Sequence, residues 1–276
     1  MAFKVIGMED TAEKQRLANI IRHLVASASG VYGKNKERVG IYEEDGVRYL
    51  HFGTPWIQGA MRIGKPDAIE VEYVQQMMVW TLFMANPAHI CQLGLGAATL
   101  TRFSHLHYPD AQVTAVEIDQ DVIDICRSEF LLPPDGDRLK VRLGDAMAFV
   151  SDPVNHGTID ILQVDLYDAD ARGPALGSPE FYRACADCLK PDGIMTINLF
   201  CDYPEHNDHL RRMEAVFEAV VWLPEVHDSN IVAIGFKSAP VLDFEELYAR
   251  AERLSQRLGL PARTWVDGLY SWMERN

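Results

Sequence analysis

The sequence ICQLGLGAATLTRFSHLHYPDAQVTAVEID, residues 90–119, decides the fold of this chain. Its apolar start, 90–93, predicts a strand, Gly94-Leu95-Gly96 predicts a sharp turn, and 98–107 can form a helix. A second apolar run then leads into Glu117. Glycines let a backbone approach a ligand closely, and a carboxylate about twenty residues after the turn can accept both hydroxyls of a ribose. The stretch therefore predicts a strand–turn–helix–strand unit that binds an adenosine.

The glycine turn leaves the kind of nucleoside open. A dinucleotide fingerprint has a third glycine three residues after the second, and residue 99 of this chain is Thr. The looser turn fits ligands of the S-adenosylmethionine type better. In the alternative interpretation, Gly94 and Gly96 only tighten a strand-to-helix turn.

Composition narrows the class of protein. The chain has 276 residues, of which 48% are apolar and 24% charged, as is ordinary for a soluble globular protein. A net charge of −14 argues against nucleic-acid binding and is compatible with a small cationic substrate, although acidity can also serve solubility alone. The apolar runs are too short to span a bilayer, and the five cysteines are widely scattered. We therefore expect a cytoplasmic protein with no membrane partner.

Beyond the central unit, strand and helix patterns alternate, which predicts an α/β, doubly wound and mostly parallel sheet. The predicted strands are 90–93, 113–117, 139–143, 159–164, 193–198, 219–223 and 230–236. The predicted helices are 98–107, 121–130, 145–150, 179–189, 207–217 and a final one at 244–258, before a tail with Trp265 and Trp272. The last two strands have no helix between them, so they should pair antiparallel. This seven-stranded ending is typical of the Rossmann-like sheet of class I S-adenosylmethionine methyltransferases.

The N-terminal part has a different pattern. Asp45-Gly46 lies between two runs of alternating polarity, which predicts a β-hairpin. The expected elements are a helix at 9–26, strands at 39–43 and 47–52, and a helix at 68–84. We therefore expect two domains: an N-terminal helix and β-hairpin unit at 1–67, and a Rossmann-like nucleoside-binding catalytic domain at 68–276.

Polar residues follow the third and fourth strands of the main sheet, at the edge where such folds bind ligands. Asp145 can accept from an adenine amino group while the backbone of Ala146 donates to the ring, although Asp145 can equally cap the next helix. Asp165 and Asp168 follow the fourth strand. Two neighbouring carboxylates need a cation or hydrogen-bond donors between them, unless Asp165 simply bonds to the following loop.

The order of these motifs resembles that of the spermidine synthase and polyamine aminopropyltransferase family, as a divergent bacterial-type member. The matching segments are VEID at 116–119, GDA at 144–146, D-x-x-D at 165–168, Gly173-Pro174-Ala175, Pro179-Glu180-Phe181-Tyr182 and Leu189-Lys190-Pro191-Asp192-Gly193. The resemblance implies a transferase that moves the aminopropyl group of decarboxylated S-adenosylmethionine to a polyamine. It also implies a homodimer with no metal and no permanently bound cofactor.

The resemblance assigns a role to each candidate site residue. Glu117 would hold the ribose, and Asp165 and Asp168 the attacking amine. Because Asp165 ends an apolar strand, where burial raises the pKa of a carboxyl group, we expect it to be the base and Asp168 to anchor a cation. The residues implied to hold the rest of the nucleoside are Gln58, Gly94, Gly96, Asp145, Ala146 and Pro174.

The sequence departs from the family pattern in the half of the site that would hold amines. The counterpart of an acid in the family's glycine loop is Ala97, and a Tyr-His-Glu segment corresponds to Val74-Gln75-Gln76. We therefore expect Ala97 to relax discrimination against donors that keep their carboxylate, so that S-adenosylmethionine itself stays a possible co-substrate. Two other functions remain open: a transferase of methyl or 3-amino-3-carboxypropyl groups, and a non-catalytic homologue that binds S-adenosylmethionine or methylthioadenosine.

Overall fold

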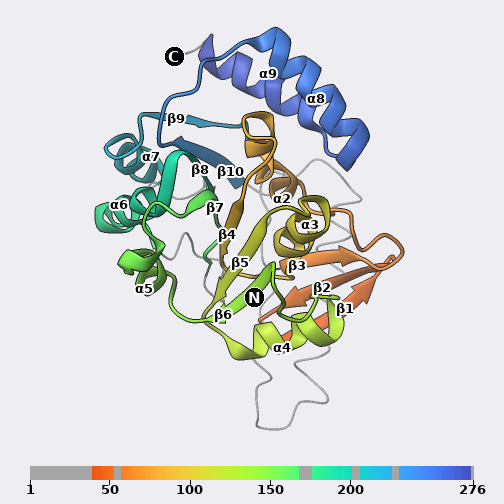
Figure 1. Ribbon diagram of the computed structural model, residues 1–276. Helices are drawn as coiled ribbons and strands as arrows, with labels where there is room; N and C mark the ends of the chain where they lie inside the picture. The colour runs from red at the N-terminus through yellow and green to blue at the C-terminus, as the bar shows by residue number, and fades with distance from the viewer. Residues whose placement is uncertain (1–38, 53–56, 168–175, 201–205, 226–229, 275–276) are drawn as a thin grey trace, which may run out of the picture.

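Figure 1 shows the computed structural model, in which a large sheet with helices on both faces stands beside a small sheet. The structure describes residues 39–52, 57–167, 176–200, 206–225 and 230–274. The helix expected at 9–26 and the candidate residues Asp168 and Pro174 lie outside these ranges. Within them, no helix has the length and apolar character needed to cross a membrane.

The large sheet has seven strands in the spatial order β6-β5-β4-β7-β8-β10-β9, which confirms the expected fold class. The strands are β4 (His89–Leu93), β5 (Gln112–Glu117), β6 (Leu139–Leu143), β7 (Ile159–Val164), β8 (Leu189–Phe200), β9 (Ala219–Trp222) and β10 (Asn230–Phe236). β4 pairs in parallel with β5 and β7, while β10 pairs antiparallel with β8 and β9. Strand order reverses between β4 and β7, and open α/β sheets bind ligands beyond such a switch point.

Helices cover both faces of this sheet, because its central strands are buried on both sides. The helices are α3 (Thr99–His107), α4 (Gln120–Glu129), α5 (Ala146–Ser151), α6 (Pro179–Cys188), α7 (His206–Glu214), α8 (Phe244–Leu258) and α9 (Ala262–Met273). Ile90 of β4 belongs to a buried cluster with residues of α3, α8 and α9. The next residue, Cys91, belongs to the cluster of α5, α6 and α7. Alternate residues of one strand thus contact two helical layers.

The helix expected at 68–84 is wrong, because the segment is broken in its middle. It consists of α2 (Glu72–Gln76) and the 3₁₀ helix η1 (Val79–Leu82). The carbonyl of Met77 accepts from Gln163 Nε2 at 3.0 Å and from Thr196 Oγ1 at 3.3 Å. In a continuous helix that carbonyl would accept from the N–H of Thr81, which instead donates to the following carbonyl. Side chains of β7 and β8 therefore replace one helical hydrogen bond.

The C-terminal tail is a helix, which the sequence pattern did not predict. Trp265 and Trp272 both belong to α9, which packs against α8. Trp265 is buried in the cluster of α3, α8 and α9, and the ring of Trp272 meets that of Trp222 edge to face at 5.3 Å. The tail therefore completes one face of the sheet.

The small sheet confirms the Asp45-Gly46 hairpin and adds a strand that was not predicted. Its strands β1 (Gly40–Glu44), β2 (Val47–His51) and β3 (Ile57–Arg62) are antiparallel neighbours in chain order. β3 lies directly on the glycine turn, since a Cβ on Gly59 would come 2.6 Å from Ala97 Cβ. Glycine at 59 is therefore required for the two sheets to meet. The domain division expected at residue 67 stays a prediction.

Candidate active site

The glycine turn joins the ends of the two strands at the switch point. Gly94 has φ of 86°, and a Cβ there would come 2.1 Å from the carbonyl oxygen of Asp165. Asp165 also donates its N–H to Leu93 O at 2.9 Å. The backbone alone thus requires glycine at 94, which agrees with the interpretation that this glycine tightens the strand-to-helix turn. The same geometry holds Asp165 directly beside the turn.

Glu117 lies at the end of β5 with its carboxylate on the same turn. Oε2 accepts from the N–H of Leu95 at 2.9 Å, and Oε1 accepts from the N–H of Asp119 at 3.0 Å. Burial raises the pKa of Glu117, and these backbone hydrogen bonds oppose that rise. An ionised carboxylate has about four acceptor positions, so Glu117 keeps capacity for a further donor.

The end of β6 places the candidate residue Asp145 close to the end of β5, where Glu117 lies. The N–H of Gly144 donates to Glu117 O at 2.8 Å, which joins the ends of β5 and β6. Ile118 and Leu143 at these ends are large apolar residues that are 70% and 56% exposed. Asp145 caps α5 by accepting from Ala148 N at 2.8 Å, so the capping alternative is confirmed. Its adenine contact stays a prediction.

Asp165 is the most constrained carboxylate at this edge. Its Oδ1 accepts from Asn198 Nδ2 at 3.1 Å, and its Oδ2 accepts from the hydroxyl of Tyr73 at 3.3 Å. Burial raises the pKa of Asp165, while the hydrogen bonds from Asn198 and Tyr73 act in the opposite direction. Both partners are far away in the sequence, so these bonds are tertiary contacts and not local loop contacts. The structure thus brings α2, β7 and β8 together at one acid.

Tyr73 is the functional candidate that the sequence did not reveal. The segment that corresponds to the family's Tyr-His-Glu packs within the protein. Val74 is buried, and the side chains of Gln75 and Gln76 donate to the backbone carbonyls of Ile69 at 2.7 Å and Pro224 at 3.2 Å. Tyr73, one residue earlier, reaches Asp165 instead. An aromatic hydroxyl beside the expected segment was the available signal.

Ala97 lies on the side of the turn that faces β3, and its expected effect on donor discrimination stays a prediction. Ala97 is 2% exposed, and its Cβ lies against Gly59 of β3. An acid at 97 would have to displace β3 before it could meet any ligand. Gly94 and Gly96 are the partly exposed residues of the turn, so a ligand would meet the loop there.

Gln58 lies beside the turn, as its expected role requires. A Cβ on Gly96 would come 2.9 Å from the backbone oxygen of Gln58. The structure therefore brings together Gln58, Gly96, Glu117 and Asp165 around one sheet edge, although the ligand contacts of these residues stay predictions.

Comparisons with known proteins show which proteins this chain is similar to. The spermine/spermidine synthase domain model matches residues 82–222. A polyamine aminopropyltransferase of Neisseria meningitidis serogroup B is 33% identical over 234 residues, which cover 84% of this chain and 88% of that protein. A second one, of Chromobacterium violaceum, is 32% identical over the same shares of both chains. The human eEF1A lysine and N-terminal methyltransferase is 27% identical over 67% of this chain and 28% of its own length.

Solved structures support the fold. A probable spermidine synthase from Corynebacterium glutamicum superimposes with a TM-score of 0.68 at 22% identity, covering 88% of this chain and 95% of that one. Human methyltransferase-like protein 13, in complex with SAH, gives 0.60 at 23% identity over 68% of this chain and 93% of that one. At such identities the likeness shows the fold alone. The domain match and the one-third identity to curated relatives along most of both chains show that this protein belongs to the spermine/spermidine synthase family.

Proposed function

We propose that this protein transfers the aminopropyl group of decarboxylated S-adenosylmethionine to an amine of a polyamine and releases methylthioadenosine. The observation that carries the proposal is the juxtaposition of two carboxylates, the buried Glu117 and the partly buried Asp165, on one glycine turn. Glu117 bonds to the turn through Leu95, and Asp165 adjoins it through the close approach to Gly94. The curated relatives named polyamine aminopropyltransferases support the same activity.

The reaction forms one N–C bond and breaks one C–S bond. A neutral amine attacks the methylene carbon of the sulfonium, the sulfur leaves as a neutral thioether, and the amine loses a proton. The ordinary pKa of such an amine is about 10 and that of a carboxylate about 4, so full proton transfer would cost roughly 8 kcal/mol. Burial raises the pKa of Asp165 and so narrows this gap. Asp165 is therefore the proposed base.

Tyr73 and Asn198 are the proposed positioning residues for that base. Each donates to a different oxygen of Asp165, so the carboxylate cannot rotate without losing one bond. A fixed carboxylate orients the attacking nitrogen toward the sulfonium carbon, which raises the rate by proximity. Asp168 remains the proposed anchor for a second ammonium group of the polyamine.

The nucleoside half is proposed to lie along the ends of β4, β5 and β6. Glu117 would accept the ribose hydroxyls, and the exposed Ile118 and Leu143 would cover the faces of the adenine ring. Asp145 keeps one carboxylate oxygen for the adenine amino group while its other oxygen caps α5. The remaining proposed contacts are Gln58, Gly94, Gly96, Ala146 and Pro174.

Methyl transfer is the second candidate, because the human eEF1A methyltransferase relative matches two-thirds of this chain. The product separates the two functions. The full chain is incubated with either decarboxylated or intact S-adenosylmethionine and a panel of putrescine, cadaverine and spermidine, and the nucleoside product is identified by mass spectrometry. Methylthioadenosine with the decarboxylated donor is the expected product. S-adenosylhomocysteine would mean methyl transfer, and no nucleoside product with either donor would mean a binding protein.

We further propose that the protein works as a cytoplasmic homodimer. The resemblance of its motifs to those of the aminopropyltransferase family supports this assembly, and the scattered cysteines fit a reducing compartment. Light scattering coupled to size exclusion should give twice the mass of one chain. A monomeric mass would refute the assembly without bearing on the chemistry.

A further inference from the structure

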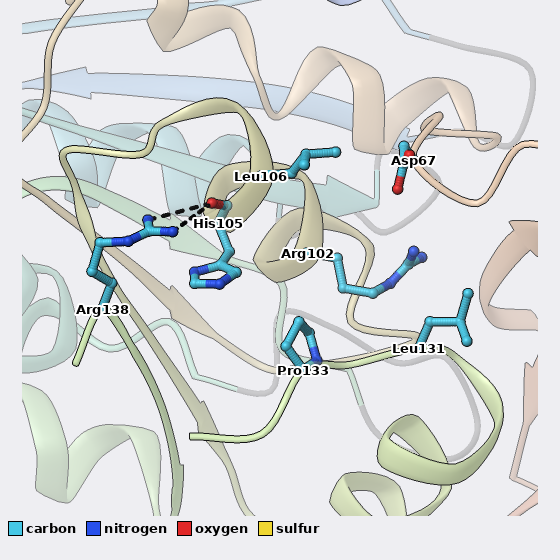
Figure 2. A pocket seen from close by; sticks show the side chains of 7 residues that line it. All are labelled: Asp67, Arg102, His105, Leu106, Leu131, Pro133 and Arg138. Carbon is cyan, nitrogen blue, oxygen red and sulfur yellow. Dashed lines mark hydrogen bonds between the residues drawn. The ribbon is translucent and has the colours of Figure 1, made fainter. Parts of the chain in front are cut away.

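A cavity of about 260 Å³ lies beside α3 (Figure 2). Arg102 and His105 of α3 line it together with Asp67, Leu131 and Arg138 from three other segments. None of the residues Gly94, Glu117 and Asp165 lines it. Figure 2 shows the side chain of Arg102 extending between Asp67 and Leu131. The cavity therefore needs its own explanation.

Arg102 is a buried cation with an incomplete set of partners. Its side chain donates from Nη1 to Pro66 O at 2.7 Å, and the residue is 8% exposed. Its Nε and Nη2 are buried and have no hydrogen-bond partner among the described residues. An arginine remains charged in proteins, so two buried donors without acceptors carry a substantial desolvation cost. That cost would be relieved by an acceptor that enters from the cavity.

The two unpartnered nitrogens specify the shape of that acceptor. Nε and Nη2 lie on one edge of the guanidinium group, and this edge can donate two parallel hydrogen bonds to an anion with two oxygens on one centre. Arg62 of the same protein uses this edge: its Nε donates to Glu70 Oε2 at 2.8 Å, and its Nη2 donates to Glu70 Oε1. Arg102 has the same edge without a carboxylate on it.

The other lining residues set the charge of the cavity. Arg138 contributes a second cation. Its guanidinium group donates to the carbonyls of His105 and Tyr108, each at 3.4 Å. His105 has a buried Nδ1 without a partner among the described residues. Asp67 is the acid among the lining residues, and its charge interacts with Arg102. The cavity thus has two cations against one carboxylate, and the apolar side chain of Leu131 also lines it.

We propose that this cavity binds a small oxyanion through the Nε and Nη2 edge of Arg102. The bound group is a carboxylate or a phosphate, which share the required pair of oxygens. Arg138 adds attraction from the other end of the cavity, and Asp67 opposes binding. Leu131, which also lines the cavity, is exposed, so the cavity is open to solvent beside this side chain.

Isothermal titration calorimetry of the full chain in a Tris–chloride buffer of low ionic strength tests the proposal, with inorganic phosphate and butyrate as the two probes. Arg102→Met should weaken binding by at least about tenfold, because a bidentate charged contact is lost. Arg138→Met should weaken it by about threefold, and Asp67→Asn should strengthen it by about threefold, as expected for partly screened charges. Tighter binding of butyrate would identify an organic carboxylate as the ligand, and tighter binding of phosphate would identify a phosphate.

The matched controls change the same charges outside the cavity. Arg142→Met and Asp192→Asn replace exposed residues that do not line it, and both should bind each probe within about twofold of the parent. Arg102→Lys keeps the charge and removes the fork, so it tests the geometry if Arg102→Met fails to fold. The proposal is wrong if the parent binds neither probe saturably, if Arg102→Lys binds like the parent, or if Asp67→Asn weakens binding.

Discussion

Replacing Asp165 with Asn tests the proposed chemistry most directly, because it removes the base with almost no change of shape. Turnover should fall by about a hundredfold or more, since general-base catalysis contributes that much. The affinity for methylthioadenosine should stay within about twofold of the parent, because the proposed contact of Asp165 is with the amine and not with the nucleoside. Steady-state kinetics and calorimetry measure the two quantities separately.

The stability of this variant distinguishes a lost base from a damaged fold. One of the donors Asn198 and Tyr73 would then face an amide NH₂ group, a loss of about 1 kcal/mol. Against this, burial raises the folded pKa of Asp165 above its unfolded value of about 3.9. The native state therefore holds more protons between these two pKa values, so its stability falls as the pH rises through that interval. Asp165→Asn has no carboxylate to ionise, so at pH 7 this variant does not lose the stability that the parent loses when Asp165 ionises.

The melting temperature of Asp165→Asn should accordingly equal or exceed that of the parent at pH 7, and fall below it near pH 3, where the parent carboxyl is protonated. Asp192→Asn is the control, because Asp192 is exposed at a distance from the site. Full turnover in Asp165→Asn would refute the assignment of the base. A large loss of melting temperature at pH 7 would mean that Asp165 is mainly structural.

Three further changes test the neighbours of Asp165. Glu117→Ala should cost the ribose contact, roughly 2 kcal/mol or about thirtyfold in affinity for methylthioadenosine; unchanged affinity by calorimetry removes Glu117 from the site. Tyr73→Phe removes a bond that lowers the pKa of Asp165, so the acid limb of the kcat/KM profile should move to higher pH by less than about one unit. A pH profile identical to the parent's would contradict its positioning role. Gly94→Ala should lower the melting temperature and activity together, because its Cβ would strike Asp165 O and its φ of 86° is left-handed; a variant as stable as the parent would contradict that packing.

The amino-acid sequence by itself determined the order and type of the elements in the main sheet. Apolar runs of four to seven residues, separated by helical patterns, predicted β4 to β10 in order, and the strand at 230–236 and the helix at 244–258 have the expected ends. The Asp45-Gly46 hairpin was predictable for the same reason. These features depend on periodicity and turn chemistry within a few residues, which are local properties of the chain.

Only the tertiary structure decided which side chains meet at the site and which are buried. The break at Met77 depends on Gln163 and Thr196, which are 86 and 119 residues away. The pairing of Tyr73 with Asp165 spans 92 residues, and the burial of Ala97 depends on a strand that the sequence pattern did not predict. Such contacts are formed when whole elements pack against each other, and a shift of one residue along α2 points a different side chain at the same acid. A local pattern can therefore identify the strand end that carries Asp165, while the partners that hold its carboxylate come from the packing of α2 and β8 around it.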